Sequence, residues 1–246
     1  MTDSHVPLLL LHAFPLNARM WQEQVTGLPE LRTLTVDLYG RLDAEPSVDV
    51  MARLAAERLD AAGVERAVLG GLSMGGYVAM AFARAFPERV AGLLLADTKA
   101  VADTEAQTAN RERIAQAVLA RQSVRLLVDE QLPAPLLGAR TPLERPELTA
   151  HVAAMMLEAT PEAVAWAQRA MATRPDSFET LRGMDVPAAV VVGAEDTLTP
   201  VSDAEAMAEA LPKAELTILQ GAGHLSSLET PDSFNDTVRA LFSRVA

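Results

Sequence analysis

The serine at position 73 stands between two glycines, in Gly71-Leu72-Ser73-Met74-Gly75, a spacing that is typical of a nucleophile held on a sharp turn. The apolar run 67–70 precedes this pattern and the helical run 76–80 follows it, so the turn is expected to lead from a strand into a helix. Such a turn strains the serine backbone and leaves no room for side chains at the two flanking positions. The sequence therefore predicts that Ser73 is a nucleophile and that the Met74 N–H lies at the start of a helix, where developing negative charge is favoured.

A serine hydroxyl is a weak nucleophile until a base accepts its proton, and the chain offers 4 histidines for this role. His224 ends the glycine-rich segment 221–224, directly after the last apolar run, which is where ligands meet the strands of a doubly wound sheet. His5 lies in the terminal tail, and His12 and His151 are more simply explained as packed or solvated side chains. His224 is therefore the expected base.

The base needs a third group that holds its tautomer and stabilises its charged form. Asp196 ends the short turn that follows the apolar run 190–192, and the order serine, aspartate, histidine is the one expected in a sheet of this kind. Two other carboxylates compete. Glu195 is adjacent and is expected to point elsewhere, whereas Asp97 ends an earlier apolar run and remains an alternative to Asp196.

The elements that must position these residues follow an alternating pattern. Continuous apolar runs of strand length are typical of parallel strands that are covered on both faces. The helical patterns between them lie at 49–62, 75–85, 201–211 and 231–245. We therefore predict the α/β class, with a doubly wound, mainly parallel sheet of about six strands. The apolar runs that we assign to these strands are 6–11, 34–37, 67–70, 90–96, 188–193 and 215–219.

Residues 101–186 interrupt this alternation with alanine-rich helical stretches at 103–121, 146–158 and 161–173. A segment of roughly 85 residues is far longer than the connection between two strands requires. We therefore predict that residues 1–100 and 187–246 form an α/β core into which a helical cap, residues 101–186, is inserted.

The predicted cap is rich in large apolar side chains and has few cationic ones between them. Met155 and Trp166, together with Leu198 of the core, are expected to line the substrate pocket, although their spacing also fits the interior of the cap. An apolar acyl or alcohol group is therefore expected to fit better than a dianionic one.

Composition excludes several classes of function. Of the 246 residues, 50% are hydrophobic and 22% are charged, which is typical of a globular chain. No uncharged apolar run reaches the length of about 18 residues that a membrane span needs. The 21 basic and 33 acidic side chains give a net charge of −12, which opposes binding to nucleic acid and to anionic lipid.

The absence of cysteine excludes disulfides, thiolate metal sites and cysteine nucleophiles. The histidines show neither His-x-His nor His-x-x-x-His spacing, so no metal site and no cofactor are expected. Residues 1–5 carry no basic cluster, and the apolar stretch after them is short, so no signal peptide is predicted and a cytoplasmic location is expected.

With these motifs the chain resembles a compact member of the α/β-hydrolase fold superfamily, and more narrowly the small bacterial carboxylesterases and the 3-oxoadipate enol-lactonases. The resemblance implies Ser73 as nucleophile, His224 as base and Asp196 as the acid that orients it. It also implies that the N–H groups of Phe14 and Met74 form an oxyanion hole. The segments that carry the resemblance are 11–16, 36–40, 70–77, 193–200 and 221–224.

One departure concerns Ala13, which stands where such families usually have glycine. If this position required a positive φ, the methyl group would strain the loop and shift the Phe14 N–H.

The expected reaction is the cleavage of a small carboxylic ester through an acyl-enzyme, with a small-molecule ester as the partner and no cofactor. Three alternatives stay open. Two are enzymes with the same triad: an enol-lactonase and a cofactor-free perhydrolase or haloperoxidase. The third is a receptor-like protein that binds a ligand on the same fold without turnover.

Overall fold

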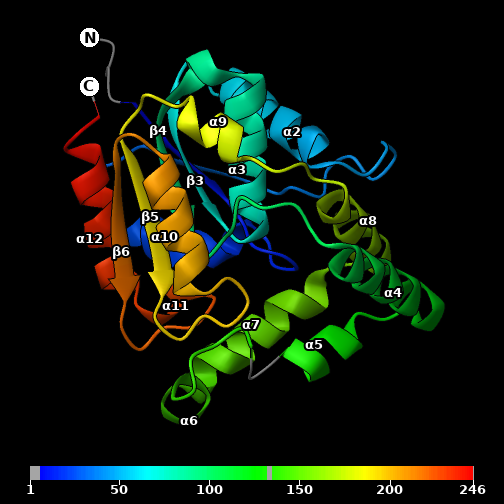
Figure 1. The fold of residues 1–246 in the computed structure, drawn as a ribbon. Helices are drawn as coiled ribbons and strands as arrows, with labels where there is room; N and C mark the ends of the chain where they lie inside the picture. The colour runs from blue at the N-terminus through cyan, green and yellow to red at the C-terminus, as the bar shows by residue number, and fades with distance from the viewer. Residues whose placement is uncertain (1–5, 132–134, 246) are drawn as a thin grey trace.

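A computed structural model describes residues 6–131 and 135–245 of the chain. The described residues contain one parallel sheet in the order β2-β1-β3-β4-β5-β6 (Figure 1). This arrangement confirms the predicted fold class, and each strand lies on one of the six predicted apolar runs. The strands are β1 (Leu8–Leu11), β2 (Thr33–Val36), β3 (Ala67–Leu72), β4 (Val90–Ala96), β5 (Ala188–Gly193) and β6 (Ala214–Leu219).

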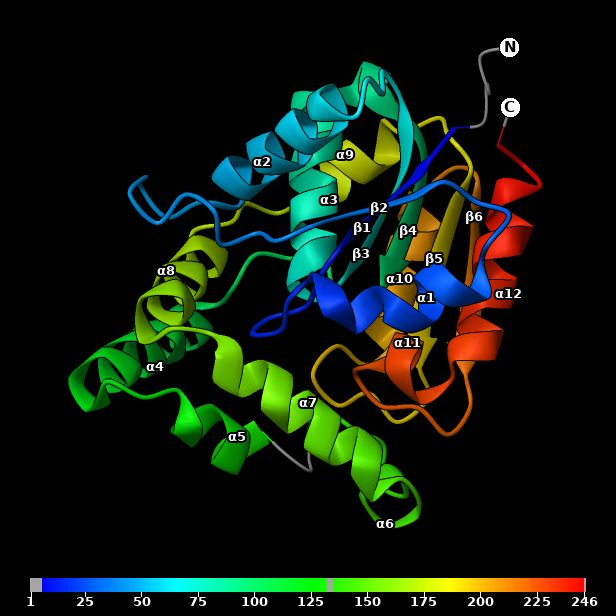
Figure 2. The ribbon, with the colours of Figure 1, turned by 180° about the vertical axis from the view of Figure 1, so that it is seen from behind.

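Continuous apolar strands are explained by the two layers of helices that cover the sheet. Along β1, Leu9 and Leu11 enter one hydrophobic cluster, whereas Leu8 and Leu10 enter the other. The first layer contains α2 (Val48–Ala61), α3 (Met74–Ala85), α9 (Phe178–Arg182) and α10 (Val201–Ala210). The second, seen in front of the sheet in Figure 2, contains α1 (Gln22–Gly27), α11 (Ser226–Glu229) and α12 (Pro231–Phe242). Two short 3-10 helices, η1 (Ala18–Trp21) and η2 (Pro87–Arg89), complete these connections.

The remaining helices lie beyond the carboxyl ends of the strands (Figures 1 and 2). We call α4 to α8 the helical insertion. Three of its helices confirm predicted stretches, whereas α5 and α6 were not predicted because segments of 7 and 4 residues are too short to show a helical period. The helices are α4 (Glu105–Arg121), α5 (Arg125–Gln131), α6 (Thr141–Glu144), α7 (Pro146–Glu158) and α8 (Pro161–Ala172).

The helical insertion leaves the sheet and returns to it at adjacent points. The Ser177 N–H donates a hydrogen bond to the carbonyl oxygen of Ala100, at 2.9 Å. The Arg174 guanidinium donates to the carbonyl oxygen of Val101, at 3.0 Å. After this stem, α9 packs against α3 and α10 on the sheet, so the projecting part of the chain ends before the predicted boundary at residue 186.

Within residues 6–131 and 135–245, none of the helices combines the length and the apolar character that crossing a lipid bilayer requires.

Candidate active site

Ser73 is the single residue between the end of β3 and the start of α3. Its backbone has φ 55° and ψ −114°, in a region that side-chain-bearing residues rarely occupy. A Cβ atom on Gly71 would lie 2.1 Å from the Gly75 carbonyl oxygen, and one on Gly75 would lie 2.0 Å from the Leu11 carbonyl oxygen. The tight approach that was predicted from the glycine spacing is therefore present.

The strained backbone at Ser73 is held by hydrogen bonds from the neighbouring strand. The Ser73 N–H donates to the Ala96 carbonyl oxygen at 2.9 Å. The hydroxyl of Thr98 donates to the Ser73 carbonyl oxygen at 2.8 Å. These contacts with the end of β4 fix the direction in which the Ser73 hydroxyl leaves the turn.

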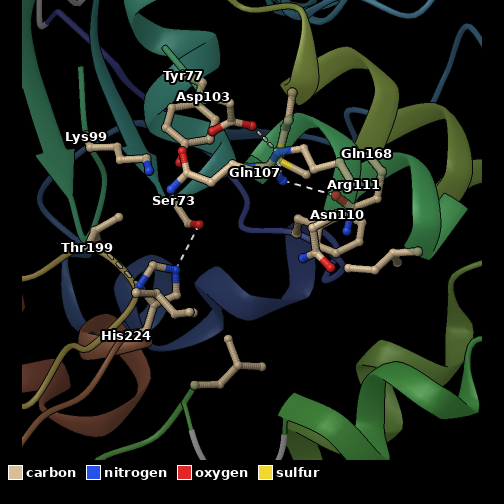
Figure 3. Close-up of a pocket in the computed structure, with 15 residues that line it drawn as sticks. Ser73, Tyr77, Lys99, Asp103, Gln107, Asn110, Arg111, Gln168, Thr199 and His224 are labelled. Carbon is tan, nitrogen blue, oxygen red and sulfur yellow. Dashed lines mark hydrogen bonds and ion pairs between the residues drawn. The ribbon is translucent and has the colours of Figure 1, made fainter. Parts of the chain in front are cut away.

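The structure brings together the three side chains that were predicted to act as a triad, and Figure 3 shows two of them, Ser73 and His224. His224 Nε2 lies 2.9 Å from Ser73 Oγ, and His224 Nδ1 lies 2.8 Å from Asp196 Oδ2. The three residues follow β3, β5 and β6, so the parallel sheet presents them at one edge. The distances are those of a base in contact with both a nucleophile and an orienting acid.

The Asp196 carboxylate accepts four hydrogen bonds in total. Besides His224, its donors are the N–H groups of Leu198 and Thr199, at 2.8 and 3.1 Å, and the Thr199 hydroxyl, at 2.7 Å. Burial by itself raises the pKa of Asp196, but the hydrogen bond and charge of His224 and the Thr199 donors outweigh it and lower the pKa below its ordinary value. Asp196 is therefore ionised at neutral pH.

The two competing carboxylates have other partners. Glu195 accepts a hydrogen bond from the Ala139 N–H, at 2.7 Å. Asp97 has φ 44° and accepts from the Gly193 N–H, at 2.8 Å, and from the Ser226 hydroxyl. Burial raises the pKa of Asp97 to about 7. Asp97 thus links the end of β5 to α11.

Burial acts to lower the pKa of His224, as the sequence led us to expect for a covered base. The hydrogen bond and the charge of Asp196, with smaller contributions from Asp97 and Glu229, outweigh burial and raise the pKa above its ordinary value. The sequence could not decide between these opposing effects, whereas the structure does.

A buried carboxylate that the sequence analysis missed holds the loop before His224. Glu229 accepts hydrogen bonds from the Gly223 N–H at 2.7 Å, from the Gly138 N–H at 2.8 Å, and from the Thr141 hydroxyl. This arrangement joins the loop of the base to Gly138 and to Thr141, the first residue of α6. A glutamate at the end of a four-residue helix gives no sequence signal of burial, so only the fold reveals this role.

The loop after β1 is shaped by His12, which is fully buried. Its Nε2 accepts a hydrogen bond from the Leu38 N–H at 3.0 Å, so Nδ1 carries the proton that it donates to the Ala13 carbonyl oxygen at 2.9 Å. Burial lowers the pKa of His12 to about 4, so the ring is neutral. His12 therefore has the packing role that was expected, while His151 is exposed on α7 and His5 lies outside the described residues.

The predicted oxyanion donors lie on this loop and at the start of α3. The φ angle of Ala13 is not positive, so its methyl group does not strain the loop. Phe14 lines the same cavity as Ser73, and Met74 is the first residue of α3. Neither the Phe14 N–H nor the Met74 N–H donates to an acceptor in the described part of the chain.

A cavity of about 260 Å³ lies beside Ser73 and His224. Its walls come from the ends of the strands, from α3, and from α4 and α8 of the helical insertion (Figure 3). Leu198 lines it, as expected. The other lining residues are Phe14, Tyr77, Lys99, Asp103, Gln107, Asn110, Arg111, Ile114, Leu136, Gln168, Met171 and Thr199.

The expectation that Met155 and Trp166 line this cavity is wrong. Met155 is buried in the same cluster as Leu16 and borders a separate cavity behind the loop after β1. The Trp166 indole N–H donates to the Ala44 carbonyl oxygen at 2.8 Å, and Trp166 borders a separate cavity together with Leu42 and Leu119. Helical spacing predicted correctly that both side chains are buried, but it does not indicate which neighbour covers them.

The cavity is also more polar than expected, because α4 contributes its polar face. Arg111 on this helix pairs with the buried Asp103 carboxylate, and Arg174 pairs with the same carboxylate at 2.8 Å. The Arg174 guanidinium stacks on the ring of Tyr77, with its carbon 4.0 Å from the ring centre. The sequence did not indicate these charged side chains, and the preference for an apolar over a dianionic group stays a prediction.

In the part of the chain that the structure describes, no group of three or more histidine, aspartate and glutamate side chains is arranged to hold a metal ion.

A family model described as the alpha/beta hydrolase family matches residues 8–237. A thermophilic esterase from Thermogutta terrifontis, solved with malate bound, is 37% identical, with a TM-score of 0.93 over 98% of this chain and 90% of that one. The 3-oxoadipate enol-lactonase 2 of Acinetobacter baylyi is 26% identical over 96% of this chain and 88% of its own length. A pimeloyl-[acyl-carrier protein] methyl ester esterase of Yersinia pseudotuberculosis is 29% identical over 92% of this chain and 89% of its own.

Proposed function

Because this chain belongs to the alpha/beta hydrolase family, we propose that it is a serine esterase that cleaves small carboxylic esters through an acyl-enzyme. The observation that carries the proposal is the continuous hydrogen-bond path from Ser73 Oγ through His224 to Asp196, with steps of 2.9 and 2.8 Å. A serine in such a path can lose its proton as it attacks, whereas an isolated serine hydroxyl cannot.

In the proposed reaction, Ser73 Oγ attacks the ester carbonyl carbon while His224 Nε2 accepts the hydroxyl proton. The N–H groups of Phe14 and Met74, which lack acceptors among the described residues, stabilise the negative charge on the carbonyl oxygen. The alcohol then leaves with the proton from His224. A water molecule, deprotonated by His224, releases the acid and restores Ser73.

We also propose that the helical insertion acts as a cap that shapes the acyl site. Two of its helices, α4 and α8, supply walls of the cavity, while all three triad residues lie outside it. Changes in the sequence of the helical insertion would alter the preferred substrate and leave the reaction at Ser73 unchanged.

A lactonase is the second candidate, since a lactone is an internal ester and one of the similar proteins is an enol-lactonase. Perhydrolysis would use the same triad with peroxide in place of water, and a receptor-like protein would bind without turnover. A panel of 4-nitrophenyl esters graded by acyl length, run beside a lactone and a peroxide assay, separates these activities.

The test of the nucleophile is Ser73→Ala. We expect the variant to fold and to lose roughly 10⁴- to 10⁶-fold in kcat on 4-nitrophenyl butyrate. The matched control is Ser243→Ala, which removes a hydroxyl whose one hydrogen bond among the described residues is donated to the Ala240 carbonyl oxygen, near the end of α12. Retention of most activity by purified Ser73→Ala would contradict the proposal.

A further inference from the structure

The ammonium group of Lys99 faces the cavity that holds Ser73. Lys99 is three residues beyond β4, is only 9% exposed, and lines this cavity; Figure 3 shows its side chain pointing into the space beside Ser73. In the described part of the chain, Lys99 Nζ has no carboxylate within 4.0 Å and donates no hydrogen bond. A cation that is taken out of water without a paired anion is costly, so its position needs an explanation.

The carboxylates nearest to this end of the cavity do not supply the missing partner. Asp103 is already paired with both Arg111 and Arg174. Asp203 influences Lys99 through its charge but forms no ion pair with it. Of the three cations Lys99, Arg111 and Arg174, Lys99 is thus the one without an ion pair among the described residues, and it lines the cavity.

Neutral polar groups surround these cations. Gln107 and Asn110 lie three residues apart on α4, and both line the cavity together with Gln168 of α8. The Gln168 side-chain oxygen accepts a hydrogen bond from Arg111, at 3.0 Å, which fixes the guanidinium against the cavity wall. Positioned cations and amides of this kind are the usual partners of a carboxylate.

Lys99 lies close to Ser73 along the backbone contacts of the site. The Thr98 hydroxyl is bonded to the Ser73 carbonyl oxygen, and Lys99 is the next residue, so nucleophile and ammonium start from neighbouring backbone positions. The cavity of about 260 Å³ lies between them and α4. An acyl group attached to Ser73 therefore needs only a short chain to bring a second functional group to Lys99.

On the basis of the esterase function above, we propose that the acyl group of the substrate ends in a carboxylate and that Lys99, with Arg111, binds it. The preferred substrates are then monoesters of short dicarboxylic acids. Arg111 is committed in part to Asp103, so Lys99 is the residue that determines this specificity.

The pKa of Lys99 and the net charge of the chain both bear on this assignment. Burial lowers the pKa of Lys99, with the charge of Arg174 acting in the same direction, and a bound carboxylate would offset both effects. The net charge of the chain is −12, so the protein as a whole does not attract anions. A preference for an anionic substrate would have to arise locally.

The test compares 4-nitrophenyl hydrogen succinate with its neutral methyl ester, methyl 4-nitrophenyl succinate. We expect the wild-type protein to give a higher kcat/KM for the anionic ester. Lys99→Met keeps the length of the side chain and removes its charge, and we expect it to lower the ratio of the two kcat/KM values roughly 10- to 100-fold. Lys213→Met is the matched control, because it makes the same charge change at the only other lysine, which is exposed and paired with Asp185.

A binding measurement keeps the inference separate from the proposed function. Isothermal titration calorimetry of Ser73→Ala with monomethyl succinate and with dimethyl succinate requires no turnover. We expect the added Lys99→Met change to weaken binding of the anionic ester at least about tenfold relative to the neutral one.

Absence of hydrolysis with an intact, Lys99-dependent preference in binding would overturn the esterase function and support the carboxylate site. Hydrolysis of both esters with no preference for the anionic one, or an equal loss for both in Lys99→Met, would overturn the carboxylate site and leave the esterase function standing. An equal effect of Lys213→Met would also overturn it, since the preference would then be a property of overall charge.

Discussion

Replacement of Asp196 by asparagine tests how the proposed base is oriented. Asp196 Oδ1 accepts from the N–H groups of Leu198 and Thr199, while Oδ2 accepts from the Thr199 hydroxyl and faces His224 Nδ1. In Asp196→Asn, the amide oxygen can keep both N–H partners. The amide nitrogen then takes the place of Oδ2 and presents a donor to His224.

The expected loss follows from the tautomer of the imidazole. With a donor facing Nδ1, that nitrogen must accept, so the proton of neutral His224 moves to Nε2. His224 Nε2, which lies 2.9 Å from Ser73 Oγ, can then no longer accept the serine proton. We expect kcat to fall roughly 10⁴-fold, the scale known for this change in a serine triad. This corresponds to about 5 kcal/mol of transition-state stabilisation.

Asp97→Asn is the informative comparison, because Asp97 is the other buried carboxylate near His224. Its amide oxygen can keep the bond from the Gly193 N–H, and the Ser226 hydroxyl can turn to accept from the new amide. The negative charge of Asp97 contributes to the raised pKa of His224. Removal of this charge lowers that pKa, so the profile moves to lower pH, while the plateau of kcat/KM falls less than about tenfold.

The assay is the pH dependence of kcat/KM on 4-nitrophenyl butyrate between about pH 5 and 9, with far-UV circular dichroism and a melting curve for each variant. For Asp196→Asn we expect a much lower kcat/KM at every pH. For Asp97→Asn we expect the midpoint of the kcat/KM profile to move to lower pH. If both variants were folded and Asp97→Asn lost more kcat/KM than Asp196→Asn, the orienting acid would be Asp97 and the tautomer argument would be wrong.

Three further predictions follow from the site. For the wild-type protein, the pKa of His224 is raised above the ordinary histidine value of about 6.5, so kcat/KM should rise with pH and reach half of its plateau above that pH. A midpoint below that pH would show that burial dominates the pKa of His224. Gly75→Ala, whose Cβ would lie 2.0 Å from the Leu11 carbonyl oxygen, should lower the free energy of unfolding in urea by more than about 3 kcal/mol. Gly63→Ala, at φ 66° in open space, should cost only about 1 kcal/mol, and equal costs would contradict the packing argument. EDTA should leave the rate unchanged while an organophosphate abolishes it, and inactivation by EDTA with recovery on addition of zinc would refute the serine mechanism.

The strands and the assembly of Ser73, Asp196 and His224 could be predicted because their signals are local. A continuous apolar run indicates a strand covered on both faces, and a parallel sheet then places whatever follows each strand at one edge. The glycines at 71 and 75 are also a local signal, because other backbone atoms lie so close to them that no side chain fits at either position.

The lining of the cavity could not be predicted, because it depends on how the helical insertion is oriented above the sheet. The polar residues of α4 look like a solvated face in the sequence, yet Gln107, Asn110 and Arg111 line the cavity. Met155 and Trp166 look like pocket residues and are covered by other neighbours. The role of Glu229 depends on contacts with Gly138 and Thr141, about 90 residues away in the chain, for which no local pattern exists.

The backbone hydrogen bond between Ser177 and Ala100, at the stem of the helical insertion, has a consequence for the evolution of proteins with this fold. Because the insertion begins and ends at one point, whole helices can be gained, lost or exchanged there during evolution without changing the path of any strand. Selection can thus act on the cavity beside Ser73 by exchange of one continuous segment, while the sheet is inherited unchanged. The joint at Glu229 limits this freedom, since a replacement segment must again offer an N–H and a hydroxyl where Gly138 and Thr141 now stand.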